Sequence, residues 1–244
     1  DVTDDLHTHG VHTNLLVKTE KEGTGYSVLL TNKEGQRTAL VYRGAAGSLG
    51  VNDIPWGKLD TKWIYLSSVK GNLPLIKRIF KHAADNNIAI AWNPGSQEIR
   101  HGLRTLAHLI HGCDILLLNR EEAAILSGSA PSDLPGMLHA LLAEVPRYLA
   151  ITDGARGAYA AEGHTVFRAL PTDVPTINVT GAGDAFGAGF VAGIMSKESL
   201  TVGLQVGMLN AESVIQQIGA KNGLLPRMPG SRALGKIKLE PVVI

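Results

Sequence analysis

The sequence predicts an α/β fold, with a mostly parallel sheet covered by helices and a small antiparallel hairpin near the start of the chain. Short apolar runs alternate with segments of helical periodicity in the middle and C-terminal parts, which is typical of a parallel sheet. The early part instead alternates as a strand pair does, and the length of 244 residues suits one domain. We therefore expect a single domain over residues 1–244.

The early hairpin is predicted from two alternating segments, Tyr26–Thr31 and Arg37–Tyr42. Residues 32–35 between them read Asn-Lys-Glu-Gly, a turn in which the glycine supplies a positive φ. A ribbon of two strands is only marginally stable by itself. We therefore expect it to pack on the main body or to pair with a second copy of the chain.

The main sheet is predicted from four apolar runs of strand length and the helical segments between them. The strands are expected at residues 63–67, 88–92, 115–118 and 148–152, and the helices at residues 73–85, 104–111, 120–126 and 134–144. Two further strands, 157–161 and 165–168, predict a hairpin that turns at Gly163. Long helices are expected to start at Asp184 and Ser199.

Composition narrows the class of partner. A net charge of +1 with 18% charged residues provides no basic stripe, so neither nucleic acid nor an anionic membrane is indicated as a main partner, and a small molecule fits better. The one cysteine, Cys113, precedes an apolar run and is expected to be a buried thiol in a reducing compartment. No apolar run reaches membrane-spanning length and the first residues are unlike a signal peptide, so we expect a cytoplasmic protein.

Polar or glycine-rich segments follow the predicted strands, at residues 93–95, 119–122, 152–157 and 178–189. In open α/β sheets, ligands bind beyond the carboxyl ends of the strands. Each segment has a structural explanation when taken alone: Asn119 as an N-cap, Glu122 as a first-turn acid, and residues 152–157 as a glycine turn. Their joint occurrence favours a ligand site.

The glycine segment 178–189 is the most informative part of the chain. Thr180 can cap a helix there, the backbone N–H groups that follow can bind an anion, and Asp184 can take a proton beside it. A dinucleotide fingerprint is excluded because Gly187 comes one residue late, and the chain has no Walker loop. A glycine-rich helix start that packs closely on a sheet remains the alternative.

These segments resemble the ribokinase-like (PfkB) carbohydrate kinases. Residues 178–191 are similar to the family's C-terminal signature, 119–122 to its N-x-x-E motif, 152–157 to its nucleotide-binding turn, and 23–27, 35–37 and 42–45 to its lid hairpin. The resemblance implies a ribokinase-like three-layer α/β/α domain with a lid hairpin at about residues 13–43. It also implies ATP-dependent phosphorylation of a sugar hydroxyl.

The resemblance assigns roles to individual residues. Asp184 would be the catalytic base, and the N–H groups of Gly181, Ala182 and Gly183 would form an anion hole. Glu122 would hold Mg²⁺. The expected nucleotide-binding residues are Asn119, Thr152, Asp153, Gly154, Gly157 and Asn210.

A monovalent cation such as K⁺ is left open. The resemblance places a cation site at Asn178 and Thr180, but Asn178 stands where the family usually has aspartate, which removes a formal charge.

The part of the family's fold that binds the sugar acceptor is not fully present in this sequence. The opening strands of the family, with its sugar-binding segment, are absent from this sequence, and we expect the chain to be part of a longer enzyme. A nucleoside or vitamin kinase of the same fold and a catalytically silent ATP-binding protein therefore remain alternatives. The hairpin could also mediate a homodimer.

Other aromatic and titratable residues are expected to be structural. A solvated turn is favoured over a metal site for His7, His9 and His12. A helix surface is favoured for His101, His108 and His111, and the core or its rim for Trp56, Trp63 and Trp92.

Overall fold

The computed structural model describes residues 2–31, 37–145 and 147–243, and its central element is a seven-stranded sheet. Its strands follow chain order from one edge to the other. The first four run parallel: β3 (Trp63–Leu66), β4 (Ala89–Trp92), β5 (Ile115–Asn119) and β6 (Tyr148–Thr152). Antiparallel pairing then adds β7 (Ala158–Glu162), β8 (Thr165–Ala169) and β9 (Leu239–Val242). The predicted α/β class is confirmed.

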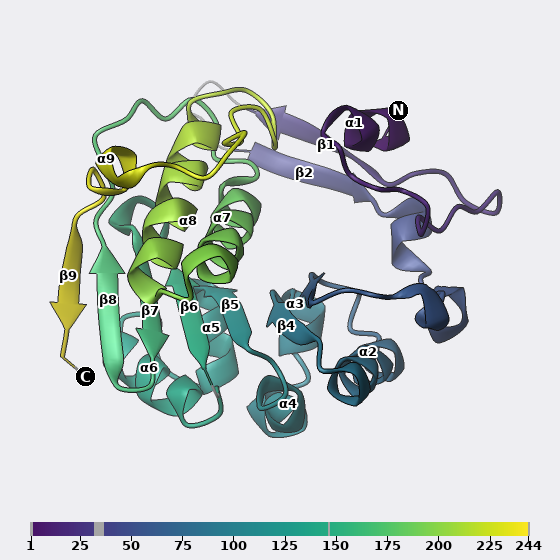
Figure 1. Cartoon of the computed structure of the whole chain (residues 1–244), viewed down its shortest axis with the longest axis horizontal. Helices are drawn as coiled ribbons and strands as arrows, with labels where there is room; N and C mark the ends of the chain where they lie inside the picture. Colours follow the sequence, from purple (N-terminus) through teal and green to yellow (C-terminus); the bar gives the residue numbers. More distant parts are fainter. Residues whose placement is uncertain (1, 32–36, 146, 244) are drawn as a thin grey trace.

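Helices cover both faces of this sheet, which makes a three-layer α/β/α arrangement (Figure 1). On one face lie α2 (Leu73–Asn86), α4 (Leu103–Ile110), α5 (Arg120–Ser127) and α6 (Leu134–Leu142); on the other lie α7 (Ala182–Lys197) and α8 (Leu200–Ile215). Strand β5 contributes to both layers, because Leu116 and Leu118 join the first core while Ile115 and Leu117 join the second. A strand buried on two faces reads as a continuous apolar run.

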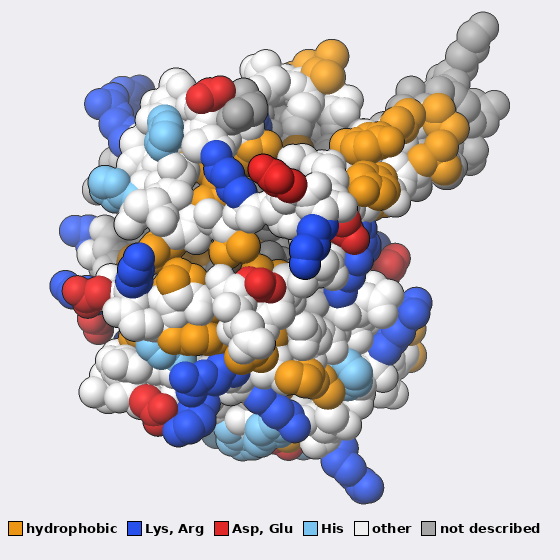
Figure 2. All heavy atoms as spheres, turned by 90° about the vertical axis from the view of Figure 1, so that its right-hand side faces the viewer, with side chains coloured by type: hydrophobic (Ala, Val, Ile, Leu, Met, Phe, Trp, Pro, Cys, Tyr) orange, Lys and Arg blue, Asp and Glu red, His pale blue; other side chains and the backbone are white. Residues whose placement is uncertain are grey.

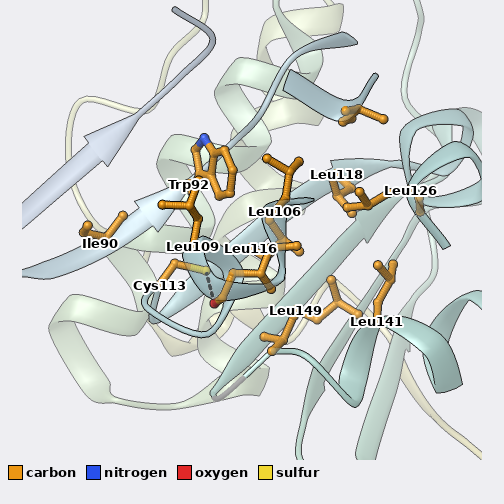
Figure 3. Packing of buried hydrophobic residues seen from close by; sticks show 14 of the residues in the cluster. Ile90, Trp92, Leu106, Leu109, Cys113, Leu116, Leu118, Leu126, Leu141 and Leu149 are labelled. Carbon is orange, nitrogen blue, oxygen red and sulfur yellow. Dashed lines mark hydrogen bonds between the residues drawn. The ribbon is translucent and has the colours of Figure 1, made fainter. Parts of the chain in front are cut away.

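The core beneath α4 packs Trp92, Leu106 and Leu116 around Cys113 (Figure 3). The Cys113 thiol donates a hydrogen bond to the Ile110 carbonyl at 3.1 Å, and its side chain is only 1% exposed. Burial raises the pKa of this thiol to about 12, so it stays protonated. The predicted buried thiol is confirmed.

The hairpin forms a separate two-stranded sheet of β1 (Tyr26–Thr31) and β2 (Arg37–Tyr42), with Tyr26 opposite Tyr42 and Val28 opposite Leu40. It lies apart from the main sheet (Figure 1), and Figure 2 shows that it projects as an arm on which hydrophobic side chains gather. The turn predicted at residues 32–35 lies outside the described residues.

Several elements were not predicted. Helix α1 (Val2–Thr8) has no buried residue, and β9 contains a proline at the sheet edge, so neither carries a clear periodic signal. The structure also has short helices at α3 (Ser96–Ile99) and α9 (Ser231–Leu234), and 3₁₀ turns at Gly44–Gly47, Val51–Asp53, Trp56–Lys58 and Gly154–Arg156. Within the described ranges, no helix combines the length and the apolar character needed to cross a bilayer.

The residues expected to be structural find local partners. His7 contacts the Thr13 hydroxyl at 2.6 Å, and His9 lies beside Asp5 in α1. His111 lies 3.3 Å from Glu144 at the helix surface. Trp92 is fully buried in the core.

Candidate active site

A pocket lies where the carboxyl ends of the central strands meet the start of α7. Its polar lining includes Asn93 after β4, Asn119 at the end of β5, Glu122 in the first turn of α5, Thr152 at the end of β6, and Asp184 in the first turn of α7. Leu117, Leu118, Gly183, Phe186 and Gly187 complete it. The structure therefore brings together residues from all four segments that the sequence singled out.

The start of α7 is set by Gly181. This residue is the N-cap, with φ of 82°, and a Cβ atom here would lie 2.0 Å from the carbonyl oxygen of Ala220. Both the left-handed backbone and the close approach require glycine. The prediction that Thr180 caps the helix is wrong, because Thr180 lies one residue before the cap and its backbone N–H donates to Asn178 Oδ1 at 2.7 Å.

The first turn of α7 has the properties of an anion site next to a carboxylate. The first N–H groups of a helix lack partners within it, and the helix dipole adds positive potential there. A Cβ atom on Gly183 would meet nothing within 4 Å, so this glycine opens onto the pocket. The Ala182 N–H is already engaged, in a 3.3 Å hydrogen bond to the Val179 carbonyl.

Close helix packing accounts for the later glycines of α7. A Cβ atom on Gly193 would lie 2.7 Å from the Cα of Gly203 in α8, and one on Gly189 would lie 2.8 Å from the Val206 carbonyl oxygen. Both interpretations of the glycine segment thus have a place in the structure. The end near Asp184 faces the pocket, and the remainder of the helix packs on α8.

Asn119 and Glu122 form a capping box at the start of α5. The Asn119 side chain accepts from the Glu122 N–H at 2.8 Å, and Glu122 Oε2 accepts from the Asn119 N–H at 2.9 Å. Burial raises the pKa of Glu122, partly offset by that hydrogen bond and reinforced by the charge of Glu121. Capping and pocket lining are therefore combined in the same two residues.

The turn after β6 is fixed by Asp153. Its carboxylate is 6% exposed and accepts from Arg120 at 2.8 Å and from Arg156 at 2.6 and 2.9 Å. Burial would raise the pKa of Asp153, but the hydrogen bonds and charges of Arg156 and Arg120 outweigh it and lower this pKa below its usual value. Asp153 is thus committed to arginines, while Thr152 lines the pocket.

Gly154 and Gly157 shape the same turn. Gly154 has a φ of 55°, and Gly157 has a φ of 94° and passes so close to Ala169 that a Cβ atom would lie 2.1 Å from its carbonyl oxygen.

Asn178 and Asn210 do not line the pocket. Asn178 stabilises the turn before α7 through Thr180. Asn210 lies inside α8, and its buried side chain donates to the Ala185 carbonyl at 2.7 Å and accepts from the Leu225 N–H at 2.9 Å. It connects α8 to the first turns of α7.

One buried acid near the pocket was missed in the sequence. Glu98 in α3 has 0% exposure, and its carboxylate accepts four hydrogen bonds of 2.8 to 3.0 Å, from Ser68 Oγ and from the N–H groups of Val69, Gly71 and Gly95. It ties the segment after β3 to the segment after β4. A glutamate three residues after Gly95 is a helix-start signal that could have indicated it.

Comparison with known proteins identifies a family for this chain. The family described as pfkB family carbohydrate kinase matches residues 1–227. An uncharacterized sugar kinase from Archaeoglobus fulgidus is 24% identical over 225 residues, covering 90% of this chain and 87% of that protein. The ribokinase of Staphylococcus aureus is 24% identical over 227 residues, covering 90% and 73%. The structure of adenosine kinase from Sinorhizobium meliloti matches with a TM-score of 0.78 and 26% identity, covering 90% of this chain and 69% of that one.

Proposed function

Because the chain belongs to the pfkB family of carbohydrate kinases, it is a phosphotransferase with a hydroxyl acceptor, and we propose that it transfers the γ-phosphoryl group of ATP to a hydroxyl of a sugar. One observation carries the proposal. A single pocket joins Asp184 and the open Gly183 of the α7 start to the polar ends of β5 and β6.

Asp184 is the proposed general base. It accepts the proton of the acceptor hydroxyl as the oxygen attacks the γ-phosphorus, and the bond from that phosphorus to the bridging oxygen of ADP breaks. The N–H groups of the first turn of α7, with Gly183 the most open, stabilise the charge that develops on the phosphoryl oxygens. Gly181 contributes mainly by holding the turn, and the Ala182 N–H must exchange its 3.3 Å bond to Val179 to take part.

Nucleotide and Mg²⁺ are assigned to the β5 and β6 side. Glu122 and Asn119 are proposed to hold Mg²⁺, which neutralises phosphate charge when bound. These residues fit Mg²⁺, because Glu122 supplies a carboxylate oxygen. Burial disfavours the ionised form of Glu122 and so raises its pKa, and a bound cation would stabilise that ionised form. Thr152, Gly154 and Gly157 are proposed to line the nucleotide site. Asp153 is proposed to support that site by holding the turn after β6, and Asn210 by joining α8 to α7.

Activation by K⁺ is proposed to be weak. Asn178 lacks the charge of the usual aspartate, and its Oδ1 atom already accepts from the Thr180 backbone.

The direct test is ADP release by the full chain, measured with a panel of sugars and nucleosides. We expect Asp184→Asn to lower kcat by about 10²- to 10⁴-fold, because the general base is lost. Asp85→Asn, on the exposed surface of α2, is the matched control and should leave turnover unchanged. Wild-type turnover by Asp184→Asn would contradict the mechanism.

The same panel separates the alternatives. Similarity to the S. meliloti adenosine kinase favours a nucleoside as the second candidate acceptor. Turnover with nucleosides and not with sugars would select it. ATP binding without turnover on any acceptor would support a catalytically silent protein.

A further inference from the structure

Tyr65 lies on β3, and its position in the sheet directs its side chain toward α7. In the parallel register Tyr65 pairs with Ala91 of β4, and Ala91 pairs with Ile115 of β5. Ala91 and Ile115 belong to the core cluster of α7 and α8. Residues in register share a face of the sheet, so the Tyr65 side chain lies on the α7 face.

The Tyr65 hydroxyl reaches α7 at Gly187. A Cβ atom on Gly187 would lie 2.4 Å from Tyr65 Oη and 3.5 Å from ring atom Cζ, so the missing side chain makes room for the hydroxyl alone. Gly187 lines the pocket and follows Asp184 by three residues, which places both on the same side of the helix. The phenol therefore ends at the pocket wall, one turn from the proposed base.

The chemistry of this phenol is restricted. Burial of the phenol and the negative charge of Asp184 raise the pKa of Tyr65 to about 12. The hydroxyl therefore stays protonated near neutral pH and serves as a hydrogen-bond donor or acceptor, and the role of base is left to Asp184. The residue is still 41% exposed, so a ligand can reach it.

The position of Tyr65 suits an acceptor better than a nucleotide. The sheet order is β3-β4-β5-β6, and the residues proposed for nucleotide and Mg²⁺ come from β5, β6 and α5. In-line transfer requires the attacking and leaving oxygens to lie on opposite sides of the phosphorus. The acceptor then approaches Asp184 from the side of β3 and β4.

We propose that Tyr65 is an acceptor-binding residue, whose hydroxyl hydrogen-bonds to an oxygen of the acceptor beside the one that faces Asp184. The inference rests on the proposed kinase function. The acceptor it selects is a polyol, such as a sugar or the ribose of a nucleoside, with a second oxygen next to the reacting hydroxyl.

The test is steady-state kinetics of Tyr65→Phe with the best acceptor found for the wild type. Loss of one hydrogen bond should raise the acceptor KM at least threefold while the KM of ATP stays within twofold. Tyr148→Phe is the matched control and should change neither constant, because Tyr148 is the first residue of β6 and lies at the strand end away from the pocket. If Tyr65 only fills space, Tyr65→Phe should not change the KM of the acceptor relative to the KM of ATP.

A second variant tests the contact itself. Gly187→Ala should displace the hydroxyl and raise the acceptor KM in the wild-type background. In the Tyr65→Phe background it should add less than twofold, because only the hydroxyl clashes with the new methyl group.

The outcomes separate the two proposals. A wild type without turnover on any acceptor overturns both. An active wild type overturns the assignment of Tyr65 alone if Tyr65→Phe raises the acceptor KM less than threefold, if it raises the KM of ATP equally, or if the effects of the two substitutions multiply.

Discussion

Glu98 shows how one residue joins two segments that are distant in the sequence, those after β3 and after β4. Its carboxylate is fully buried, yet four donors surround it. Burial by itself would raise the pKa of Glu98, but hydrogen bonds led by that of Gly71 outweigh it and lower the pKa below 4.5. The ionised carboxylate of Glu98 thereby joins the loops after β3 and β4.

Glu98→Gln should therefore destabilise the protein by about 3 kcal/mol, because the amide N–H₂ faces donors and leaves them unsatisfied. Urea unfolding measures the change. Glu240→Gln, exposed on β9, is the control and should stay within about 0.5 kcal/mol of wild type.

The pH dependence of stability follows from the same pKa. A lowered pKa means that the contribution of Glu98 is complete above its unfolded value near 4.5 and is lost as the pH falls through the lower folded value. The free energy of unfolding of Glu98→Gln should therefore fall less between neutral and acidic pH than that of the wild type. An unchanged acid profile would show that Glu98 does not carry it.

At the scale of elements, α5 combines a structural and a proposed chemical role in one helix start. The capping box of Asn119 and Glu122 satisfies orphan N–H groups whether residue 122 is glutamate or glutamine. Only glutamate offers a charged ligand for Mg²⁺.

Glu122→Gln should accordingly keep the thermal midpoint within about 3 °C of wild type, since the cap survives. The Mg²⁺ concentration for half-maximal activity should rise at least tenfold, as measured by titration of the ADP-release rate. Glu121→Gln, the exposed neighbour, is the control. If Glu122→Gln lowers the thermal midpoint but leaves the Mg²⁺ concentration for half-maximal activity unchanged, Glu122 acts only as a helix cap.

The start of α7 shows a limit of local reasoning at the same scale. Threonine is a good N-cap by propensity, and Thr180 precedes a helix, so a cap is the natural expectation. The close approach of the Ala220 backbone instead selects Gly181, whose left-handed φ only glycine adopts readily. A contact with Ala220, which is distant in the sequence, decides the cap.

At the scale of the whole molecule, the hairpin of β1 and β2 exposes large hydrophobic side chains. Strand alternation and register put Tyr26, Val28, Leu40 and Tyr42 on one face, and all four are 46–64% exposed. Figure 2 shows the resulting hydrophobic patch. We propose that this hairpin is the lid of a single-domain enzyme and that its apolar face pairs with a second copy.

Val28→Lys should then shift the protein toward monomer, because a charge would be buried in the paired face. Light scattering at micromolar concentration reports the mass. Val41→Lys, in the same ribbon but on its other face, is the matched control and should leave the mass unchanged. A monomeric wild type would rule out the dimer.

The sequence was sufficient for the order of β3 to β8 and of the long helices, and for the polar residues of the pocket. Apolar runs and helical spacing marked β3 to β8 and the long helices, because these signals are local and periodic. Polar residues after the strands marked Asn93, Asn119, Glu122, Thr152 and Asp184, because parallel strands bring their carboxyl ends to one edge.

Tertiary structure alone decided the contacts that hold the segments around the pocket together. The four donors around Glu98, the two arginines on Asp153 and the space that Gly187 leaves for Tyr65 all join segments distant in sequence. Local patterns carry no record of such contacts, since each depends on how two elements pack. The amino-acid sequence by itself determined the fold and the end of the pocket that we propose binds phosphate, whereas the packing of β3, α3 and α7 determined the side on which we propose that the acceptor binds.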